Sequence, residues 1–99
     1  MARNKLDGVI EAVRYTPGGK IAVVRMYERH GVVWSDHILV DREELSRRLE
    51  QGRRLAVGER LLYRGSVFNT GTLVRRVQGS IVTEGQSGAR DLLAGVQLF

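Results

Sequence analysis

The chain has 99 residues and no cysteine, with 42% hydrophobic and 27% charged residues, which fits one folded domain and excludes a disulfide framework or a thiolate zinc site. No run of about 18 apolar residues is present and no apolar stretch follows the basic N-terminus, so the sequence predicts a cytoplasmic protein without a membrane span. Sixteen basic and eleven acidic residues give a net charge of +5, which indicates a polyanionic partner, above all nucleic acid.

Short apolar segments rich in β-branched residues, separated by Gly, Pro and Asn, predict strands in the first part of the chain. The first strand covers residues 6–15, where Gly8 leaves room for a bend or a close backbone contact. A Pro-Gly-Gly turn leads to a second strand over residues 20–28. A tight hairpin closed by Gly31 leads to a third over residues 32–40. We expect these three strands to form a meander.

The period of the pattern changes after the third strand and indicates a helix. Asp41 can accept a hydrogen bond from the backbone at the start of a helix, and Glu44 can reach back to it. Leu45 and Leu49 then fall on one helix face, because they are spaced at i and i+4. Gly52 supplies a left-handed stop. The sequence therefore predicts a short, one-sided helix.

Two further strands follow the helix. The fourth begins at Gly58 and continues through Tyr63, with an extension to Phe68 as an alternative. Residues 69–71, Asn-Thr-Gly, predict a turn into a fifth strand over residues 72–77. The expected order along the chain is βββαββ, an all-β protein with one short helix.

This element order resembles the OB-fold, a small five-stranded barrel that binds oligonucleotides on one face. The resemblance covers about residues 6–78 and depends on the meander, the helix after the third strand and the final hairpin. SH3-like barrels are the nearest alternative, but they normally have a short turn where this chain has the helix. We therefore expect an OB-like barrel over residues 1–79. Residues 80–99 would then form a flexible linker and a short amphipathic C-terminal segment.

One face of the hairpin between the second and third strands gathers the residues that suit nucleic acid. With a short loop, Arg25 lies opposite Trp34, and Tyr27 shares their face. The same alternation across the first turn adds Arg14, Ala12 and Ile10 to this face. Rings stack on bases and guanidinium groups contact phosphates, which favours single-stranded DNA or RNA. The predicted nucleic-acid-binding residues are Arg14, Lys20, Arg25, Tyr27, Trp34, Arg53 and Arg54.

The opposite interpretation places the same face in the core. Ile10, Ile21, Val23 and Ile38 also lie on it, so that Trp34 would be buried and the arginines would lie at the rim. A hairpin loop longer by one residue would also move Trp34 to the other side of the sheet. The sequence leaves both interpretations open.

Catalysis and metal binding lack a supporting set of residues. His30 and His37 match no short ligand motif. Ser35, Asp36 and His37 are neighbours on a predicted strand, so their side chains point to alternate faces and cannot form a catalytic relay. We therefore expect a binding protein that is not an enzyme and has no cofactor and no metal.

The tail indicates a second class of function. Ala89, Leu92, Leu93 and Val96 follow at i, i+3, i+4 and i+7, one face of a helix too short to persist alone. Such a helix packs on its own barrel, on a second copy or on a partner. The Leu98-Phe99 pair resembles bacterial sliding-clamp-binding peptides. The alternative function is an interaction module or assembly subunit whose partner-binding residues are Leu92, Leu93, Val96, Leu98 and Phe99.

Overall fold

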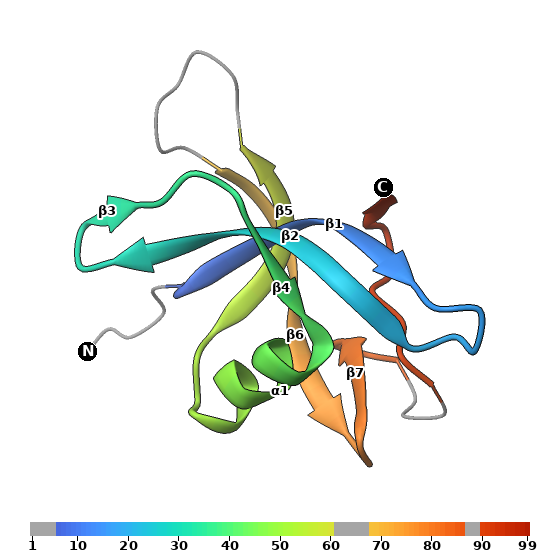
Figure 1. Cartoon of the computed structure of the whole chain (residues 1–99). Helices are drawn as coiled ribbons and strands as arrows, with labels where there is room; N and C mark the ends of the chain where they lie inside the picture. Colours follow the sequence, from blue (N-terminus) through green and yellow to red (C-terminus); the bar gives the residue numbers. More distant parts are fainter. Residues whose placement is uncertain (1–5, 61–67, 87–89) are drawn as a thin grey trace.

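A computed structural model describes residues 6–60, 68–86 and 90–99, which form one helix and eight strands (Figure 1). In chain order the elements are β1 (Gly8–Tyr15), β2 (Ile21–His30), β3 (Val33–Trp34), β4 (Ile38–Asp41), α1 (Arg42–Glu50), β5 (Leu55–Arg60), β6 (Phe68–Val77), β7 (Ser80–Thr83) and β8 (Gln97–Leu98). The protein is therefore mostly β with one helix, as expected, but the number and order of strands differ from βββαββ. In this part of the chain, no helix has the length and apolar character needed to cross a membrane.

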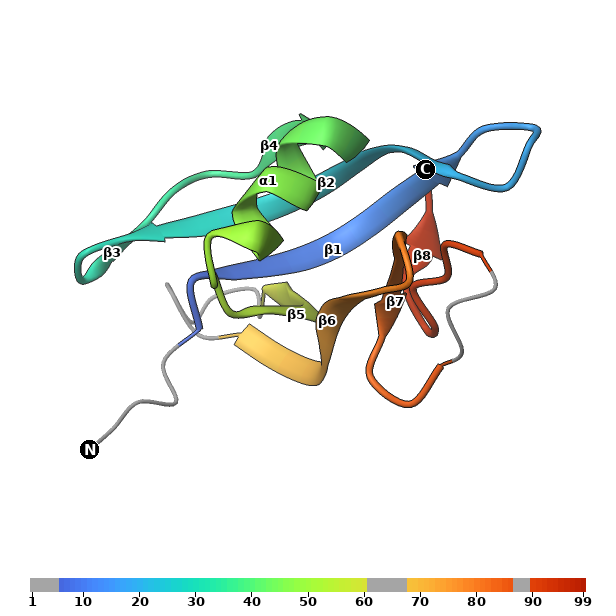
Figure 2. The same ribbon diagram turned by 90° about the horizontal axis from the view of Figure 1, so that it is seen from below.

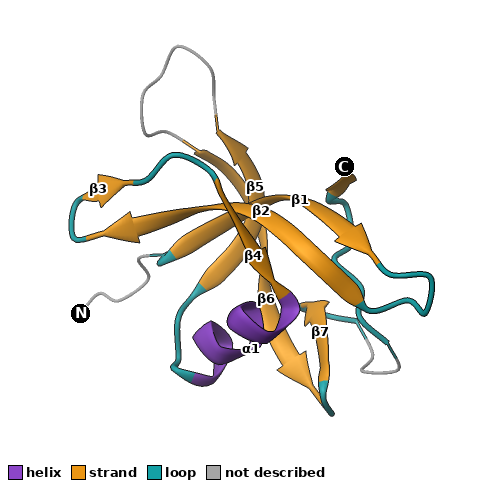
Figure 3. Cartoon of the chain, viewed as in Figure 1, coloured by secondary structure: helices purple, strands orange, loops and turns teal. Residues whose placement is uncertain are grey.

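The strands form one curled sheet in the order β3-β2-β1-β5-β6-β7, with β4 also paired to β2 and β8 to β1. Most neighbours are antiparallel, but β1 pairs in parallel with both β5 and β8. Figure 2 shows that the sheet curls into a half-barrel, and Figure 3 separates its strands from the single helix. This shape is compatible with a small barrel-like fold.

The predicted hairpin between the second and third strands forms with a different register. β2 continues to His30, and the loop begins at Gly31, which has a φ of +67° and so suits the first central position of a tight turn. Consequently Trp34 pairs with Arg29 and not with Arg25.

The predicted third strand is interrupted at Ser35. Its N–H donates to the Glu28 carbonyl oxygen (2.8 Å), and its hydroxyl oxygen accepts from the Glu28 N–H (3.0 Å). The chain rejoins the edge of β2 as β4, where Met26 pairs with Ile38. One predicted strand therefore becomes two, β3 and β4.

A β-bulge at Glu11 decides which residues of β1 face the core. Ile10 pairs with Met26, but the next pair is Ala12 with Arg25, so that Glu11 is an extra residue on β1. The extra residue reverses the alternation, and Ile10 joins Met26 in the core cluster. The prediction that Ile10 shares the face of Arg25 is therefore wrong.

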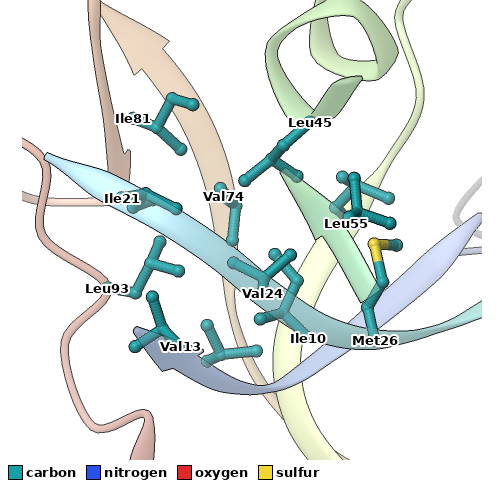
Figure 4. Close-up of a cluster of buried hydrophobic side chains, with 12 residues drawn as sticks. Ile10, Val13, Ile21, Val24, Met26, Leu45, Leu55, Val74, Ile81 and Leu93 are labelled. Atoms are coloured by element: carbon teal, nitrogen blue, oxygen red, sulfur yellow. The ribbon is translucent and has the colours of Figure 1, made fainter. Parts of the chain in front are cut away.

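The core draws side chains from most of the sheet, from α1 and from the C-terminal residues (Figure 4). A second bulge, at Ala22, brings both Ile21 and Val24 into it. Figure 4 shows Leu93 beside Ile21, and Leu93 is only 2% exposed. The buried cluster contains Ile10, Val13, Ile21, Val24, Met26, Val40, Leu45, Leu55, Val57, Val74, Ile81 and Leu93.

The helix begins and ends where the sequence predicts. The Asp41 carboxylate accepts from the Glu44 N–H (2.9 Å), Leu45 is fully buried, and Gly52 follows the helix with a φ of +83°. The reciprocal contact from Glu44 to Asp41 is replaced, because the Glu44 carboxylate accepts from the Arg48 guanidinium (3.3 Å). The cap is thus one-sided.

The turn predicted at residues 69–71 is wrong, because these residues lie inside β6, which begins at Phe68. The Gly58 of β5 allows the two strands to approach, since an added Cβ would lie 2.6 Å from the Asn69 carbonyl oxygen. Residues 61–63 of the predicted fourth strand lie outside the described residues.

The predicted C-terminal helix is wrong for residues 90–99, which are extended or in turns. Leu92 forms a bridge with Val82, and β8 pairs with β1. Thr83, which falls within the expected linker and tail of residues 80–99, is 1% exposed at the end of β7. The boundary expected after residue 79 falls in the turn between the paired strands β6 and β7.

Candidate nucleic-acid interface

The predicted nucleic-acid-binding residues fall in separate places in the fold. The aromatic ones lie toward the β2–β3 turn, two arginines lie farther along β1 and β2, and one lysine lies at the β1–β2 turn. The aromatic residues are Tyr27 and Trp34, the two arginines are Arg14 and Arg25, and the lysine is Lys20. Arg53 and Arg54 lie elsewhere, just before β5.

Three rings form a continuous cluster near the β2–β3 turn. The ring centroids of Trp34 and Phe68 lie 4.6 Å apart, and those of Tyr27 and Phe68 lie 5.2 Å apart. Tyr27 is 7% exposed, whereas Trp34 and Phe68 are half-buried. The expectation that Tyr27 is exposed is therefore wrong. Trp34 lies between the two sequence interpretations, since it is neither fully buried nor fully exposed.

An apolar groove of 410 Å³ opens beside the two half-buried rings. Val9 contributes to its wall from β1, and Val32 from the β2–β3 turn, where it is 90% exposed. A concave apolar site bordered by half-exposed rings can accept a flat, apolar ring.

Arg29 forms the basic side of this groove and is held in place by several contacts. Its Nε donates to the Leu6 carbonyl oxygen (2.7 Å), and its Nη2 donates to the Asp7 carboxylate (3.2 Å). Asp7 also accepts from the Arg54 backbone N–H (2.8 Å), which places Arg54 near the groove. The Arg54 side chain has no ion pair within the described residues. Arg60 lies with its guanidinium carbon 5.5 Å from the centroid of the Tyr27 ring.

Arg14 and Arg25 are covered by the C-terminal residues. Their guanidinium carbons lie 4.8 and 5.1 Å from the centroid of the Phe99 ring. The Arg14 Nε also donates to the Phe99 backbone oxygen (2.9 Å), and the Arg25 Nε donates to the Glu11 carboxylate (2.6 Å). A ring of the same chain therefore occupies the strip that the sequence predicts to be open.

The predicted partner-binding residues are mostly used within the chain. Leu93 is in the core, Val96 packs against the core, and Leu92 is half-buried. Phe99 lies against the two arginines, and Leu98 is 70% exposed. No continuous apolar helix face is present in residues 90–99.

Two buried groups near the interface, the Tyr27 phenol and the Glu28 carboxylate, have shifted pKa values. Burial and then a hydrogen bond with Glu11 raise the pKa of Tyr27. The hydrogen bond from Arg48 lowers the pKa of Glu28 despite its burial. Arg53 lies 3.9 Å from the same Glu28 carboxylate, so part of its charge is compensated.

Phe68 and Arg29 belong to the groove but have no functional signal in the sequence pattern, which assigns Phe68 to a strand end and Arg29 to a turn. The contact between Phe68 and Trp34 depends on the whole strand order, because β6 reaches β2 only through β5 and β1. No local spacing could therefore have indicated it.

The chain matches no protein-family model, no curated protein and no solved structure. Among the described residues, no group of three or more His, Asp or Glu is placed to hold a metal ion. The geometry of the aromatic cluster is thus the basis for a functional assignment.

Proposed function

We propose that the protein binds single-stranded nucleic acid without catalysis and that bases stack in the groove beside Trp34 and Phe68. The supporting observation is the pair of adjoining, half-exposed rings at an apolar groove, in a domain of net charge +5. Aromatic platforms beside cationic side chains are the usual means of holding single strands, because every base has a face that can stack.

The cationic part of the interface consists of Arg29, whose charge is partly compensated by Asp7, and Arg54, which has no ion pair among the described residues. Arg29 is fixed by its contacts with Leu6 and Asp7, which reduces the entropy cost of contacting a phosphate. Arg54 is exposed nearby. The OB-like resemblance, as part of the same proposal, implies binding on the face of the second and third strands, where the groove lies.

The test is a titration of labelled single-stranded and double-stranded oligonucleotides at two salt concentrations, read by anisotropy. We expect single strands to bind more tightly, with a log-log salt slope of about 0.7 per phosphate contact. Trp34→Ala should weaken binding by about 1–3 kcal/mol, the value of one stacked base. Leu98→Ala truncates an apolar side chain that does not line the groove. This variant is the control and should bind like the wild type.

The absence of salt-dependent binding to every oligonucleotide at low ionic strength would contradict the proposal. Equal binding by the wild type and by Trp34→Ala would show that the groove is not part of the nucleic-acid interface.

A protein-docking role is the second candidate, because two apolar side chains project at the β2–β3 hairpin. Val32 is 90% exposed and Val33 is 64% exposed. Binding through such residues depends weakly on salt, whereas phosphate contacts depend on it strongly. Salt-dependent retention on an immobilised nucleic acid therefore distinguishes the two candidates.

A further inference from the structure

A second cavity, of 360 Å³, lies at the opposite end of β2 from the aromatic groove. Its walls include the β1–β2 turn at residues 18–19 and the β6–β7 turn at residues 78–79. Three cationic residues, Lys20, Arg42 and Arg90, also line it. The cavity therefore combines four segments that are far apart in the sequence: residues 18–20, Arg42, residues 78–80 and residues 90–91.

The buried carboxylate of Asp91 holds these segments together. Its Oδ2 accepts from the Ile21 N–H (2.8 Å) and from the Arg42 Nε (2.7 Å). Its Oδ1 accepts from the Ile81 N–H (2.9 Å) and from the Arg42 Nη2 (3.1 Å). With four donors and a side chain only 1% exposed, Asp91 has no capacity left for further cations.

Two positive charges at the cavity have no carboxylate partner in the part of the chain that the structure describes. Lys20 directly precedes Ile21, and Arg90 directly precedes Asp91, so both are tied to anchored backbone. Asp91 neutralises Arg42, and neither Lys20 nor Arg90 pairs with a carboxylate among the described residues. The cavity thus has two cations that an anion could offset.

We propose that this cavity binds a phosphate group through Lys20 and Arg90. A phosphate is a compact dianion with several acceptor oxygens, which suits the point charge of a lysine and the forked donors of an arginine. Arg42 stays paired to Asp91 and supports the wall. This site goes beyond the proposed function, since it does not require a strand in the aromatic groove.

The test is a titration of the full chain with inorganic phosphate at low ionic strength, followed by calorimetry. We expect saturable binding that weakens about tenfold in Lys20→Gln and in Arg90→Gln, as for the loss of one charge-assisted hydrogen bond. Arg75→Gln removes the same charge from an exposed side chain that does not line the cavity and should bind phosphate like the wild type. Unchanged thermal melting of the variants shows that the fold is retained.

Phosphate that fails to saturate the wild type, or an equal loss in Arg75→Gln, would overturn the proposal. A comparison of 5′-phosphorylated and 5′-hydroxyl oligonucleotides identifies the source of the phosphate. Tighter binding of the phosphorylated strand, lost in Lys20→Gln, would assign the site to a strand end. Equal binding of both strands together with saturable inorganic phosphate would assign it to a small phosphate compound. Binding of inorganic phosphate is measured without nucleic acid. A failure of the protein to bind oligonucleotides would therefore not affect the test of the phosphate site.

Discussion

At the scale of single residues, the charged side chain of Asp91 connects several elements of the fold. It joins the first residue of β2, the hairpin of β6 and β7, and the start of α1 through one buried carboxylate. Such a group stabilises the fold only while every donor remains paired, because an unpaired buried charge is costly.

Replacing Asp91 by Asn should therefore be strongly destabilising. The change leaves Arg42 without its ionic partner and replaces one acceptor oxygen by a donor, so we expect a loss of about 3 kcal/mol in the free energy of unfolding. Denaturant titration measures it. Glu84→Gln, which removes a carboxylate from an exposed pair with Arg75, is the matched control and should change stability by less than about 0.5 kcal/mol.

The same carboxylate should make stability depend on pH. Burial raises the pKa of Asp91, but hydrogen bonds from Arg42 and from the N–H groups of Ile21 and Ile81 outweigh burial and hold the pKa below its ordinary value. A carboxylate with a lowered folded-state pKa stabilises the fold above its unfolded-state pKa, and this contribution is lost as the pH falls through the folded-state pKa.

We expect the wild type to lose stability as the pH falls below about 4, and Asp91→Asn to lose less over the same range. Denaturant titrations of both proteins at several pH values provide the comparison. Parallel curves would show that other carboxylates, such as the Glu28 paired with Arg48, cause the acid sensitivity.

At the scale of elements, the helix is the part whose start and end both follow from local signals. Asp41→Ala should destabilise the protein by about 1 kcal/mol, because the Glu44 N–H loses its acceptor at the start of α1. Thermal melting measures the effect. Asp36→Ala changes an exposed aspartate outside any helix and should leave the melting temperature unchanged; a shift equal to that of Asp41→Ala would argue against the cap.

The strands show the limit of local patterns. Alternation predicts which face each side chain occupies, but one bulged residue reverses it, as at Glu11 and Ala22. At Gly8 one of the two expected alternatives is present, the close backbone contact. An added Cβ would lie 3.1 Å from the Tyr27 carbonyl oxygen, and also 2.7 Å from the end of the Met26 side chain.

At the scale of the whole molecule, the C-terminal residues are part of the fold. The sequence leads one to expect that deletion of residues 86–99 changes the oligomeric state while the barrel still folds. The burial of Leu93 and Asp91 predicts the opposite result, since their loss costs about 2–5 and 3–5 kcal/mol respectively. The sum is comparable to the whole stability of a small domain, about 5–15 kcal/mol.

Deletion of residues 86–99 should therefore abolish cooperative thermal unfolding and give the circular dichroism of an unfolded chain. Deletion of residues 97–99 alone removes β8 and Phe99 but keeps Asp91 and Leu93, so it should retain the fold with a lower melting temperature. A longer deletion that melts cooperatively would show that the tail is dispensable.

The amino-acid sequence by itself determined the mostly β class, the helix that begins after Asp41, the turn between β1 and β2, and the excess of positive charge. These features depend on interactions within a few residues, such as caps, tight turns and alternation. Only the tertiary structure decided that Phe68 meets Trp34, that Phe99 covers Arg14, and that Asp91 organises a cationic cavity. Those contacts follow from strand order, bulges and a long-range buried ion pair, which no local spacing encodes.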